Sequence, residues 1–269
     1  MNAITPIEEL SDKEFSLVIS IASTDAGLAI PASKKSLVQS RVARRMREIG
    51  VTDRASYFRS LESDQDERSE LIYVLTTNVS HFYREPHHFE FIRNNILSIG
   101  SPQGLRFWSA GCSNGQEPYT LALEILSAFP DAATSDVLIL ASDIDPNVLA
   151  KARSGEYSES EIEGVPKESR AKLFEKVGDQ YRVRKEIAEL VRFRNLNLNG
   201  EWPMKGQFDV ILCRNVVIYF NDETQHSLWP RFAEKLVPNG VLMLGHSERI
   251  HPLEGTGFES IGVTTYRKT

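Results

Sequence analysis

The sequence predicts an α/β protein: a doubly wound, mostly parallel β-sheet with an all-helical N-terminal domain and a small inserted antiparallel β subdomain. After residue 103, short apolar segments alternate with amphipathic helical segments, which is typical of a parallel sheet covered on both faces. Before residue 85, apolar residues recur at helical spacing without strand-like alternation. We therefore expect a helical domain over residues 1–85 and an α/β domain over residues 86–269.

The N-terminal domain is expected to contain several helices joined by short turns. Apolar residues at helical spacing predict a helix over Val38–Ile49, which Gly50 ends. Further helices are expected over Ser56–Leu61 and Glu67–Val79.

The α/β domain is expected to hold six strands of the main sheet. An inserted subdomain over residues 157–190 interrupts them, with a short helix over Glu168–Lys176 and a hairpin that includes Gln180–Arg184 and turns toward Ala188. Gly178-Asp179 is a turn signal between two polar strands of this subdomain. The expected strands of the main sheet are Leu105–Ala110, Val137–Ser142, Val191–Asn195, Phe208–Cys213, Gly240–Gly245 and Val263–Arg267.

Charge is unevenly distributed along the chain. The formal net charge of −6 argues against bulk nucleic-acid binding. Residues 34–59 contain eight basic and two acidic residues, a net charge of +6, which leaves −12 for the remainder. Such a segment is typical of a solvated helix face, and the alternative is a docking surface for an acidic partner.

Cysteine content and apolar runs indicate the compartment. Only Cys112 and Cys213 are present and no zinc-ligand pattern occurs, so we expect neither disulfides nor a metal. The opening MNAITPIEEL lacks the basic and apolar stretches of a signal peptide. The longest apolar run, Val210–Phe220, is interrupted by Arg214 and Asn215 and is too short to span a membrane. A cytoplasmic protein without membrane insertion is expected.

The segment FWSAGCSNGQEPY joins a strand to a helix through a loop with two glycines. Gly111 and Gly115 would let the backbone approach a ligand, and the helix that begins near Glu117 would point N–H groups at it. A tight strand-to-helix turn explains the glycines equally well. Glu117 itself could complement the helix dipole or bind a cofactor.

The next strand, in VLILASDID, ends on two carboxylates beside that loop. A carboxylate at the end of the second strand is the group that accepts both ribose hydroxyls of a bound nucleoside, and Asp143 is the better candidate. Asp145 precedes Pro146 and is expected to cap the helix Pro146–Arg153. A nucleotide-type pocket is therefore predicted at this edge of the sheet.

Two later strand ends fall on the same edge. NLNLN places Asn197 there, whose amide can read an adenine edge, and ILCRNVVIYF places Arg214, Asn215 and Tyr219 beyond the fourth strand. An arginine in so apolar a run is costly to bury unless a carboxylate meets it. A structural ion pair and a ligand contact both satisfy that condition.

Five segments that occur in a fixed order carry a family resemblance. They are LTTNVSHFYREPHHF, SAGCSNGQEPYTLA, ASDIDPNVLAKARSGEY, LCRNVVIYF and LGHSE. Together they closely resemble the CheR family of chemotaxis receptor methyltransferases, over residues 71–266. The helical N-terminus also suits the small first domain of that family. The fold implied is the Rossmann-like sheet of S-adenosylmethionine-dependent methyltransferases.

The resemblance implies an activity and a set of site residues. S-adenosylmethionine would bind at the strand edge, glutamate γ-carboxylates of chemoreceptors would accept its methyl group, and S-adenosylhomocysteine would be the product. Arg84 and Tyr219 would flank the transfer site as catalytic residues. Ser80 stands where threonine is usual in the family, and Tyr83 stands where phenylalanine is common. The implied cofactor ligands are Asn78, Ser80, Arg84, Glu117, Asp143, Asn197, Leu198, Arg214 and Asn215.

The implied chemistry needs no general base. A glutamate side chain, with a pKa of about 4.3, is already anionic at neutral pH and can attack the sulfonium methyl group directly. The enzyme must position and desolvate it. No catalytic role is therefore expected for His81, His87, His88 or His246, for which capping and loop hydrogen bonds suffice.

Partners also follow from the resemblance. Chemoreceptor signalling domains are long helices rich in glutamate, so Arg41, Arg44 and Arg45 in the basic segment would dock on them electrostatically. In some family members the inserted hairpin binds a pentapeptide at the receptor C-terminus. Here the connection Lys176–Tyr181 is short and contains one glycine, so an enzyme independent of the receptor tail is expected. We also expect a monomer.

Three other functions are compatible with parts of the sequence. A small-molecule carboxyl O-methyltransferase would share the fold but would lack a basic helical docking domain. A catalytically silent scaffold that binds S-adenosylmethionine would not need Arg84, Asp143 and Tyr219 together. A nicotinamide-dependent oxidoreductase would require a Gly-x-Gly-x-x-Gly loop, which is absent here.

Overall fold

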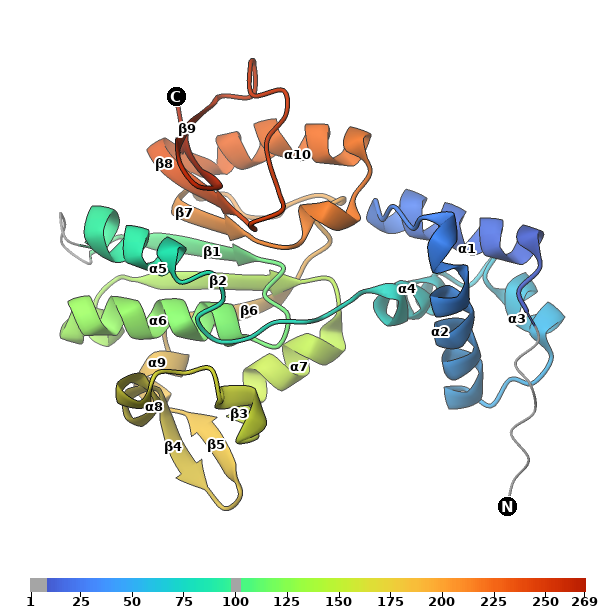
Figure 1. Ribbon diagram of the computed structural model, residues 1–269, viewed down its shortest axis with the longest axis horizontal. Coiled ribbons are helices and arrows are strands. Elements are labelled where there is room, and N and C mark those ends of the chain that lie inside the picture. The colour runs from blue at the N-terminus through green and yellow to red at the C-terminus, as the bar shows by residue number, and fades with distance from the viewer. Residues whose placement is uncertain (1–8, 98–102) are drawn as a thin grey trace. The chain divides into compact units, whose positions relative to one another are not determined.

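The computed structural model describes residues 9–97 and 103–269 and divides the chain into two compact units (Figure 1). A helical unit comprises Met1–Thr77 together with Tyr219–Thr224, and a sheet unit comprises Asn78–Ile218 and Gln225–Thr269. Residues 1–8 lie outside the described residues. The start of the predicted helical domain and most of the segment used for the signal-peptide prediction fall there. Among the described residues, no helix is long and apolar enough to cross a membrane.

Local capping signals fix the ends of the helices in the helical unit. Ser11 and Glu14 form a reciprocal capping box at the start of the first helix, which ends at Gly27 with a left-handed φ of 70°. Asp53 and Asp64 cap the third and fourth helices through their side chains. The helices are α1 (Asp12–Ala26), α2 (Lys35–Glu48), α3 (Arg54–Ser60) and α4 (Gln65–Leu75), with a 3-10 turn η1 (Ala32–Lys34) before α2.

The predicted helix over Glu67–Val79 is four residues too long at its C-terminal end, because α4 ends at Leu75 and Thr76 is extended with ψ 154°. The Thr76 hydroxyl donates to the Tyr73 carbonyl at 2.8 Å. The guanidinium of Arg41 on α2 donates to the carbonyls of Leu75 and Thr76. A side chain from a neighbouring helix therefore satisfies the last carbonyls, which no reading of local periodicity could show.

The arginines of α2 do not all face outward. Val38, Val42 and Met46 are buried, as the predicted apolar stripe requires, whereas Ile49 at the end of that stripe follows α2 and is 39% exposed. Arg45 lies against α4, where its guanidinium pairs with Glu67 at 2.6 Å and with Glu70 at 3.1 Å. The Arg45 side chain is only 16% exposed, whereas that of Arg44 is 56% exposed.

The sheet unit is built on a seven-stranded sheet in the order β6-β2-β1-β7-β8-β10-β9. Pairing is parallel from β6 through β8, and antiparallel between β8, β10 and β9. The predicted mostly parallel sheet is confirmed, with each expected strand found within a few residues of its predicted ends. The strands are β1 (Arg106–Ala110), β2 (Leu138–Asp143), β6 (Val191–Asn195), β7 (Phe208–Cys213), β8 (Leu236–Leu244), β9 (Phe258–Gly262) and β10 (Thr265–Lys268).

Helices cover both faces of the sheet, as a doubly wound fold requires. In the register, Trp108 aligns with Leu140 and Arg192, one residue out of phase with Phe193, so Trp108 and Phe193 point to opposite faces. Phe193 packs on Tyr119 of α6 (Gln116–Ala128), with ring centroids 5.6 Å apart. Trp108 packs on Phe232 of α10 (Asp222–Lys235), also at 5.6 Å.

Shorter elements complete this unit, and Figure 1 shows α6 running alongside β1 and β2. The strand β9 was not predicted, because only its first residue, Phe258, is buried and the segment lacks a regular apolar alternation. The remaining helices are α5 (His87–Ile92), the π-helix η2 (Arg93–Leu97), the 3-10 helix η3 (Pro130–Thr134), α7 (Pro146–Ser154) and the 3-10 helix η5 (Val217–Tyr219).

The inserted subdomain is a three-stranded antiparallel sheet in the order β3-β5-β4, and α8 packs against α6 (Figure 1). The predicted helix over Glu168–Lys176 is wrong at its end, because Phe174 turns into the core against Phe82 and Tyr157 and starts a strand. The segment leading to Ala188 is helical rather than part of the hairpin. The elements are β3 (Glu156–Tyr157), η4 (Ser160–Ile162), α8 (Lys167–Leu173), β4 (Phe174–Val177), β5 (Gln180–Val183) and α9 (Lys185–Ala188).

Candidate functional site

The loop that follows β1 is tied to the end of β2 by hydrogen bonds from its backbone. The Cys112 amide donates to the Ser142 carbonyl at 2.9 Å. The Ser113 amide donates to Asp143 Oδ2 at 2.8 Å, and the Asp145 amide donates to Asp143 Oδ1 at 3.1 Å. Asp143 therefore joins two loops at the carboxyl edge of the sheet, where ligands of open α/β sheets bind.

Asp143 is a buried residue, only 8% exposed. Burial raises the pKa of Asp143 to about 6, although the hydrogen bonds from backbone amides act in the opposite direction. A carboxylate offers about four lone-pair sites; the Ser113 and Asp145 amides occupy two of them, and the Ile144 amide also interacts with the group. The remaining sites fit hydroxyl donors such as those of a ribose.

Asp145 has a separate structural task. It accepts a hydrogen bond from the Asn147 amide at 2.8 Å, which confirms the prediction that it caps α7. Its other oxygen accepts a hydrogen bond from Asn78 Nδ2 at 3.0 Å, and the Asn78 carbonyl accepts one from the Ser113 hydroxyl at 3.4 Å. Asn78, a predicted cofactor ligand, therefore lies next to the loop that Asp143 holds.

The two glycines of the first loop are explained by contacts within the protein. Gly111 has φ +87°, and a Cβ there would lie 2.3 Å from Cγ2 of Val216. Gly115 has the same φ, and its Cβ would lie 2.9 Å from Cβ of Ala152. The tight-turn interpretation of these glycines therefore holds in the structure, since protein atoms fill the space that the missing side chains leave.

Arg214 and Glu117, both predicted cofactor ligands, pair with each other. Arg214 Nη1 lies 3.0 Å from Glu117 Oε2, and Glu117 Oε1 accepts a hydrogen bond from the Ser109 hydroxyl at 2.7 Å. The Arg214 side chain is 1% exposed and its guanidinium stacks over Phe89 at 5.4 Å from the ring centroid. The structural ion pair, one of the two interpretations of Arg214 from the sequence, is thus present. Burial raises the pKa of Glu117.

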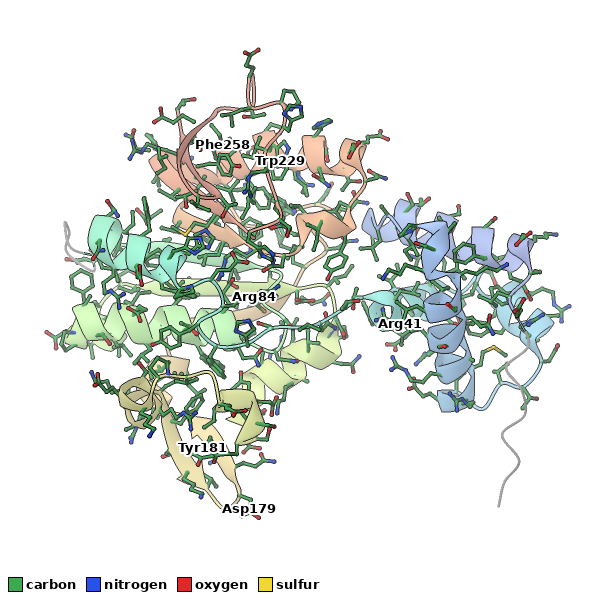
Figure 2. All side chains as sticks on the ribbon, viewed as in Figure 1. Arg41, Arg84, Asp179, Tyr181, Trp229 and Phe258 are labelled. Carbon is green, nitrogen blue, oxygen red and sulfur yellow. The ribbon has the colours of Figure 1, made fainter. Side chains whose placement is uncertain are left out.

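Arg84 lies in a strained loop, near the arrowheads of β1 and β2 in Figure 2. Its neighbours Tyr83 and Glu85 have φ values of 56° and 51°, a left-handed backbone that non-glycine residues rarely adopt. Arg214 donates to the Arg84 carbonyl, which places this loop beside the loop that follows β7. The Arg84 side chain is 28% exposed, and its Nη1 donates to the Val79 carbonyl at 3.0 Å.

Glu85 connects the Arg84 loop to the loop after β8. Glu85 Oε1 lies 3.0 Å from His246 Nδ1, and its Oε2 lies 3.5 Å from Arg214 Nη2. Burial alone would raise the pKa of Glu85, but the hydrogen bonds from His246 and the charge of Arg214 lower it to about 2. Glu85 is therefore ionised and balances the buried arginine.

The other predicted site residues are placed as follows. Asn197 and Leu198 follow β6; Asn197 Oδ1 accepts from the Asn199 amide at 2.9 Å, and Leu198 is buried. Asn215 follows β7 with a left-handed φ of 59°. Ser80 is half-buried. Tyr219 groups with the helical unit, where its carbonyl accepts a hydrogen bond from the Ala29 amide at 2.7 Å.

The histidines near this site make loop contacts. Burial lowers the pKa of His88 to about 3, so its ring is neutral, and its Nε2 lies 3.0 Å from the Thr264 hydroxyl. Within residues 9–97 and 103–269, ligand atoms of Glu85, His87 and His88 lie within 4.8 Å of one another, as in a metal centre. The charge of Arg214, 3.5 Å from Glu85 Oε2, opposes a cation at that place.

The sequence analysis gave no role to two carboxylates of the site, the half-buried Glu85 and the buried Glu248. Each is part of a segment used for the family resemblance, YREP and LGHSE. Glu85 stands between Arg84 and Pro86, and Glu248 stands between Ser247 and Arg249, which are residues typical of exposed loops. Glu248 is 2% exposed, and its carboxylate accepts hydrogen bonds from the amides of the loops after β7 and β8. That Glu248 joins the loops after β7 and β8 is visible only in the tertiary structure, where the two loops lie side by side.

A doubly wound sheet with a carboxylate at the end of its second strand is the arrangement that binds nucleoside-containing cofactors. Residues 78–267 match the family described as "CheR methyltransferase, SAM binding domain", and residues 13–76 match "CheR methyltransferase, all-alpha domain". The chain therefore belongs to the CheR methyltransferase family.

Curated relatives match nearly the whole chain. A probable chemotaxis protein methyltransferase of Rhizobium etli is 43% identical over 257 residues, which is 91% of this chain and 96% of the relative. A chemotaxis protein methyltransferase of Escherichia coli is 37% identical over 96% of this chain and 91% of its own length. One of Borreliella burgdorferi is 34% identical over 96% of this chain and 95% of its own length.

The residues at the carboxyl edge fit the cofactor of this family. Asp143 retains free lone pairs, and the buried atoms Arg214 Nε, Asn215 Oδ1 and Glu85 Oε2 have no hydrogen-bond partner in the described part of the protein. These donors and acceptors match the hydroxyl, amino and carboxylate groups of S-adenosylmethionine. The predicted ligand set therefore has hydrogen-bonding capacity left for it.

We predict that Gly111→Ala destabilises the protein by roughly 3 to 5 kcal/mol, because the added methyl group meets Val216 and the backbone is left-handed. Gly178→Ala is the matched control: φ is also positive, at +61°, but nothing lies within 4 Å. It should cost only about 1 to 2 kcal/mol. Urea unfolding of the full chain measures both, and equal losses would contradict the packing explanation. Val216→Ala should restore part of the loss in the Gly111 variant only.

Proposed function

We propose that this protein transfers the methyl group of S-adenosylmethionine to glutamate γ-carboxylates of methyl-accepting chemotaxis receptors. The three relatives described above are chemotaxis protein methyltransferases by name, and each matches at least nine-tenths of this chain. The observation that carries the proposal is the position of Arg84. Its partly exposed guanidinium sits on a strained loop that Arg214 and Glu85 hold beside the cofactor edge of the sheet.

Arg84 suits an anionic acceptor. A guanidinium can hold a carboxylate by two parallel hydrogen bonds, which fixes the direction of the attacking oxygen. When bound, S-adenosylmethionine supplies a sulfonium methyl group, which passes to the carboxylate oxygen as the carbon–sulfur bond breaks and a neutral thioether remains. No proton moves, so the neutral His88 and the other nearby histidines are not needed as bases.

The cofactor ligands we propose are those implied by the family motifs. Asp143 would accept the ribose hydroxyls, for which it retains lone pairs, and Asn197 with Leu198 would meet the adenine. Arg214 and Glu117 would act as a pair, since each already compensates the charge of the other. Asn78, Ser80 and Asn215 would complete the set, and Tyr219 would flank the transfer site with Arg84.

The helical unit is proposed to dock on the glutamate-rich helices of receptors. Of the three arginines predicted for this role, Arg44 is free to take it, because its side chain is 56% exposed. Arg41 and Arg45 hold α4, so their replacement would disturb the helical unit as well as any docking. Leu37, which is 42% exposed on the same helix, adds apolar contact area.

We also propose that methylation does not depend on a receptor tail and that the enzyme is a monomer. The connection between β4 and β5 consists only of Gly178 and Asp179, since Val177 pairs with Gln180 (Figure 2). So tight a turn leaves no loop to clamp a peptide. Micromolar or tighter binding of a receptor C-terminal pentapeptide in a titration would contradict this, and a dimer in sedimentation equilibrium would contradict the monomer.

The central test is methylation of a receptor cytoplasmic domain with labelled S-adenosylmethionine, read as base-labile methyl ester. We expect Arg84→Ala to lower kcat about a hundredfold, since one charged positioning group is lost. Tyr219→Phe should lower it up to about tenfold, the effect of one neutral hydrogen bond. His87→Ala, at an exposed histidine on the same segment, is the control and should leave kcat unchanged. Label on free carboxylic acids but never on receptors would favour a small-molecule methyltransferase.

The affinity for S-adenosylhomocysteine should depend on the ionisation of Asp143. In the unfolded chain this group has a pKa of about 3.9, whereas in the folded protein it is about 6. The protonated Asp143 therefore stabilises the folded protein at pH values below 4, and this stabilisation is lost as the pH rises through 6. Ribose hydroxyls favour the carboxylate, so affinity should fall about tenfold for each pH unit below 6. Calorimetry of Asp143→Asn, which does not titrate, should give weak and pH-independent binding; a slope equal to that of the native protein would remove Asp143 from the site.

Docking through α2 should be electrostatic. Arg44→Glu is expected to lower receptor methylation at low ionic strength, with the difference shrinking as the Debye length falls to about 10 Å at 0.1 M salt. Lys185→Glu is the matched control, because Arg44–Glu48 and Lys185–Glu189 are both exposed i,i+4 pairs at 3.6 Å. Equal rates of receptor methylation for the two variants would contradict docking by this helix.

A further inference from the structure

Glu248 occupies an unusual position in the turn after β8. Its carboxylate accepts four backbone hydrogen bonds: from the Gly245 amide at 2.5 Å, from Asn215 and Val216 at 2.8 Å, and from Ile218 at 3.1 Å. The residue is 2% exposed. No ion pair with another described residue balances its charge, so amide dipoles alone stabilise the carboxylate.

Three of these four amides belong to the loop after β7. That loop begins with Arg214, which pairs with Glu117, and continues through Asn215, a proposed cofactor ligand. It has few regular backbone partners of its own, because its amides at Asn215, Val216 and Ile218 point at Glu248 instead. The shape of the loop therefore depends on a side chain from a different strand end.

Gly245 and Glu248 together fix the conformation of this loop, Gly245 by close contact and Glu248 by hydrogen bonds. A Cβ at Gly245 would lie 2.5 Å from Asn215 Nδ2 and 2.7 Å from its backbone nitrogen, so the loops touch without a side chain between them. Asn215 takes the left-handed φ of 59° in that contact. On the other side, Val216 fills the space at Gly111. Residues 215–218 thus connect the ends of β1, β7 and β8.

We infer that Glu248 is a positioning residue of the methyl-transfer site: its carboxylate fixes residues 215–218, and through them sets Asn215 and the loop after β1 for cofactor binding. The inference rests on the proposed function only in assigning Asn215 to the cofactor. Glu248 itself touches no reacting atom. Glu248 acts by accepting hydrogen bonds from the loop backbone. Only a side chain with two acceptor oxygens can accept all four of them at this buried position.

The test is S-adenosylhomocysteine binding and receptor methylation by Glu248→Gln. The glutamine NH2 group would face backbone N–H groups, so the hydrogen bonds to one of the two carboxylate oxygens are lost. We expect Kd for S-adenosylhomocysteine to rise at least about tenfold and kcat to fall, because small displacements of positioning groups have effects of about that size or larger. KM for the receptor should stay unchanged. Glu248→Asp, which keeps both oxygens, should recover part of the affinity.

Two further variants make the result decisive. Gly245→Ala leaves the carboxylate intact but displaces Asn215, and it should raise Kd as Glu248→Gln does, even if the latter folds poorly. Glu259→Gln, at an exposed carboxylate that pairs with Arg267 at 3.5 Å, is the control and should bind as the native protein does. Circular dichroism at the assay temperature verifies that each variant is folded.

Native affinity and native kcat in both folded Glu248→Gln and Gly245→Ala would overturn the inference. A purely stabilising role would lower the unfolding temperature of these variants while Kd of the folded protein stays native, and this too would overturn it. Failure of the native enzyme to methylate any receptor would instead contradict the proposed function. The binding experiment with S-adenosylhomocysteine would still decide the role of Glu248.

Discussion

The carboxyl edge of the parallel sheet presents loop amides that no strand pairs, and buried carboxylates satisfy them. Asp143 accepts from the amides of Ser113 and Asp145 after β1 and β2, and Glu248 accepts from four amides after β7 and β8. An unpaired buried amide costs about 1 to 3 kcal/mol, so these bonds fix the loops strongly. The ligand edge is therefore shaped before a ligand arrives, and this preorganisation reduces the cost of binding.

A buried arginine links this edge to the segment that carries Arg84. Arg214 is paired with Glu117 on α6, lies near Glu85, and donates to the Arg84 carbonyl. A guanidinium at 1% exposure would be strongly destabilising without such partners. The same contacts that compensate its burial hold three separate segments together. For this reason a change that breaks the Arg214–Glu117 ion pair would also displace the segment that carries the proposed transfer site.

The helical unit shows how misleading a count of charges along a sequence can be. The segment 34–59 has a net charge of +6, yet its arginines do different work. Arg45 is neutralised by Glu67 and Glu70, and Arg41 caps the end of α4, whereas Arg44 faces solvent. Electrostatic attraction of an acidic helix would thus depend on fewer residues than the sequence indicates.

The sequence by itself determined the class of fold, the main strands, the family and the place of Asp143, because period, caps and strand ends are local patterns. It left open whether Arg214 meets a carboxylate of the protein, and it could not find Glu248 as an anchor or β9 as a strand. Only the tertiary structure decided these, and it assigned Gly111 to contact with Val216. The physical reason is that the loop contacts join residues far apart in the chain, 32 positions for Glu248–Val216 and 97 for Arg214–Glu117, and no short-range pattern encodes which loops meet.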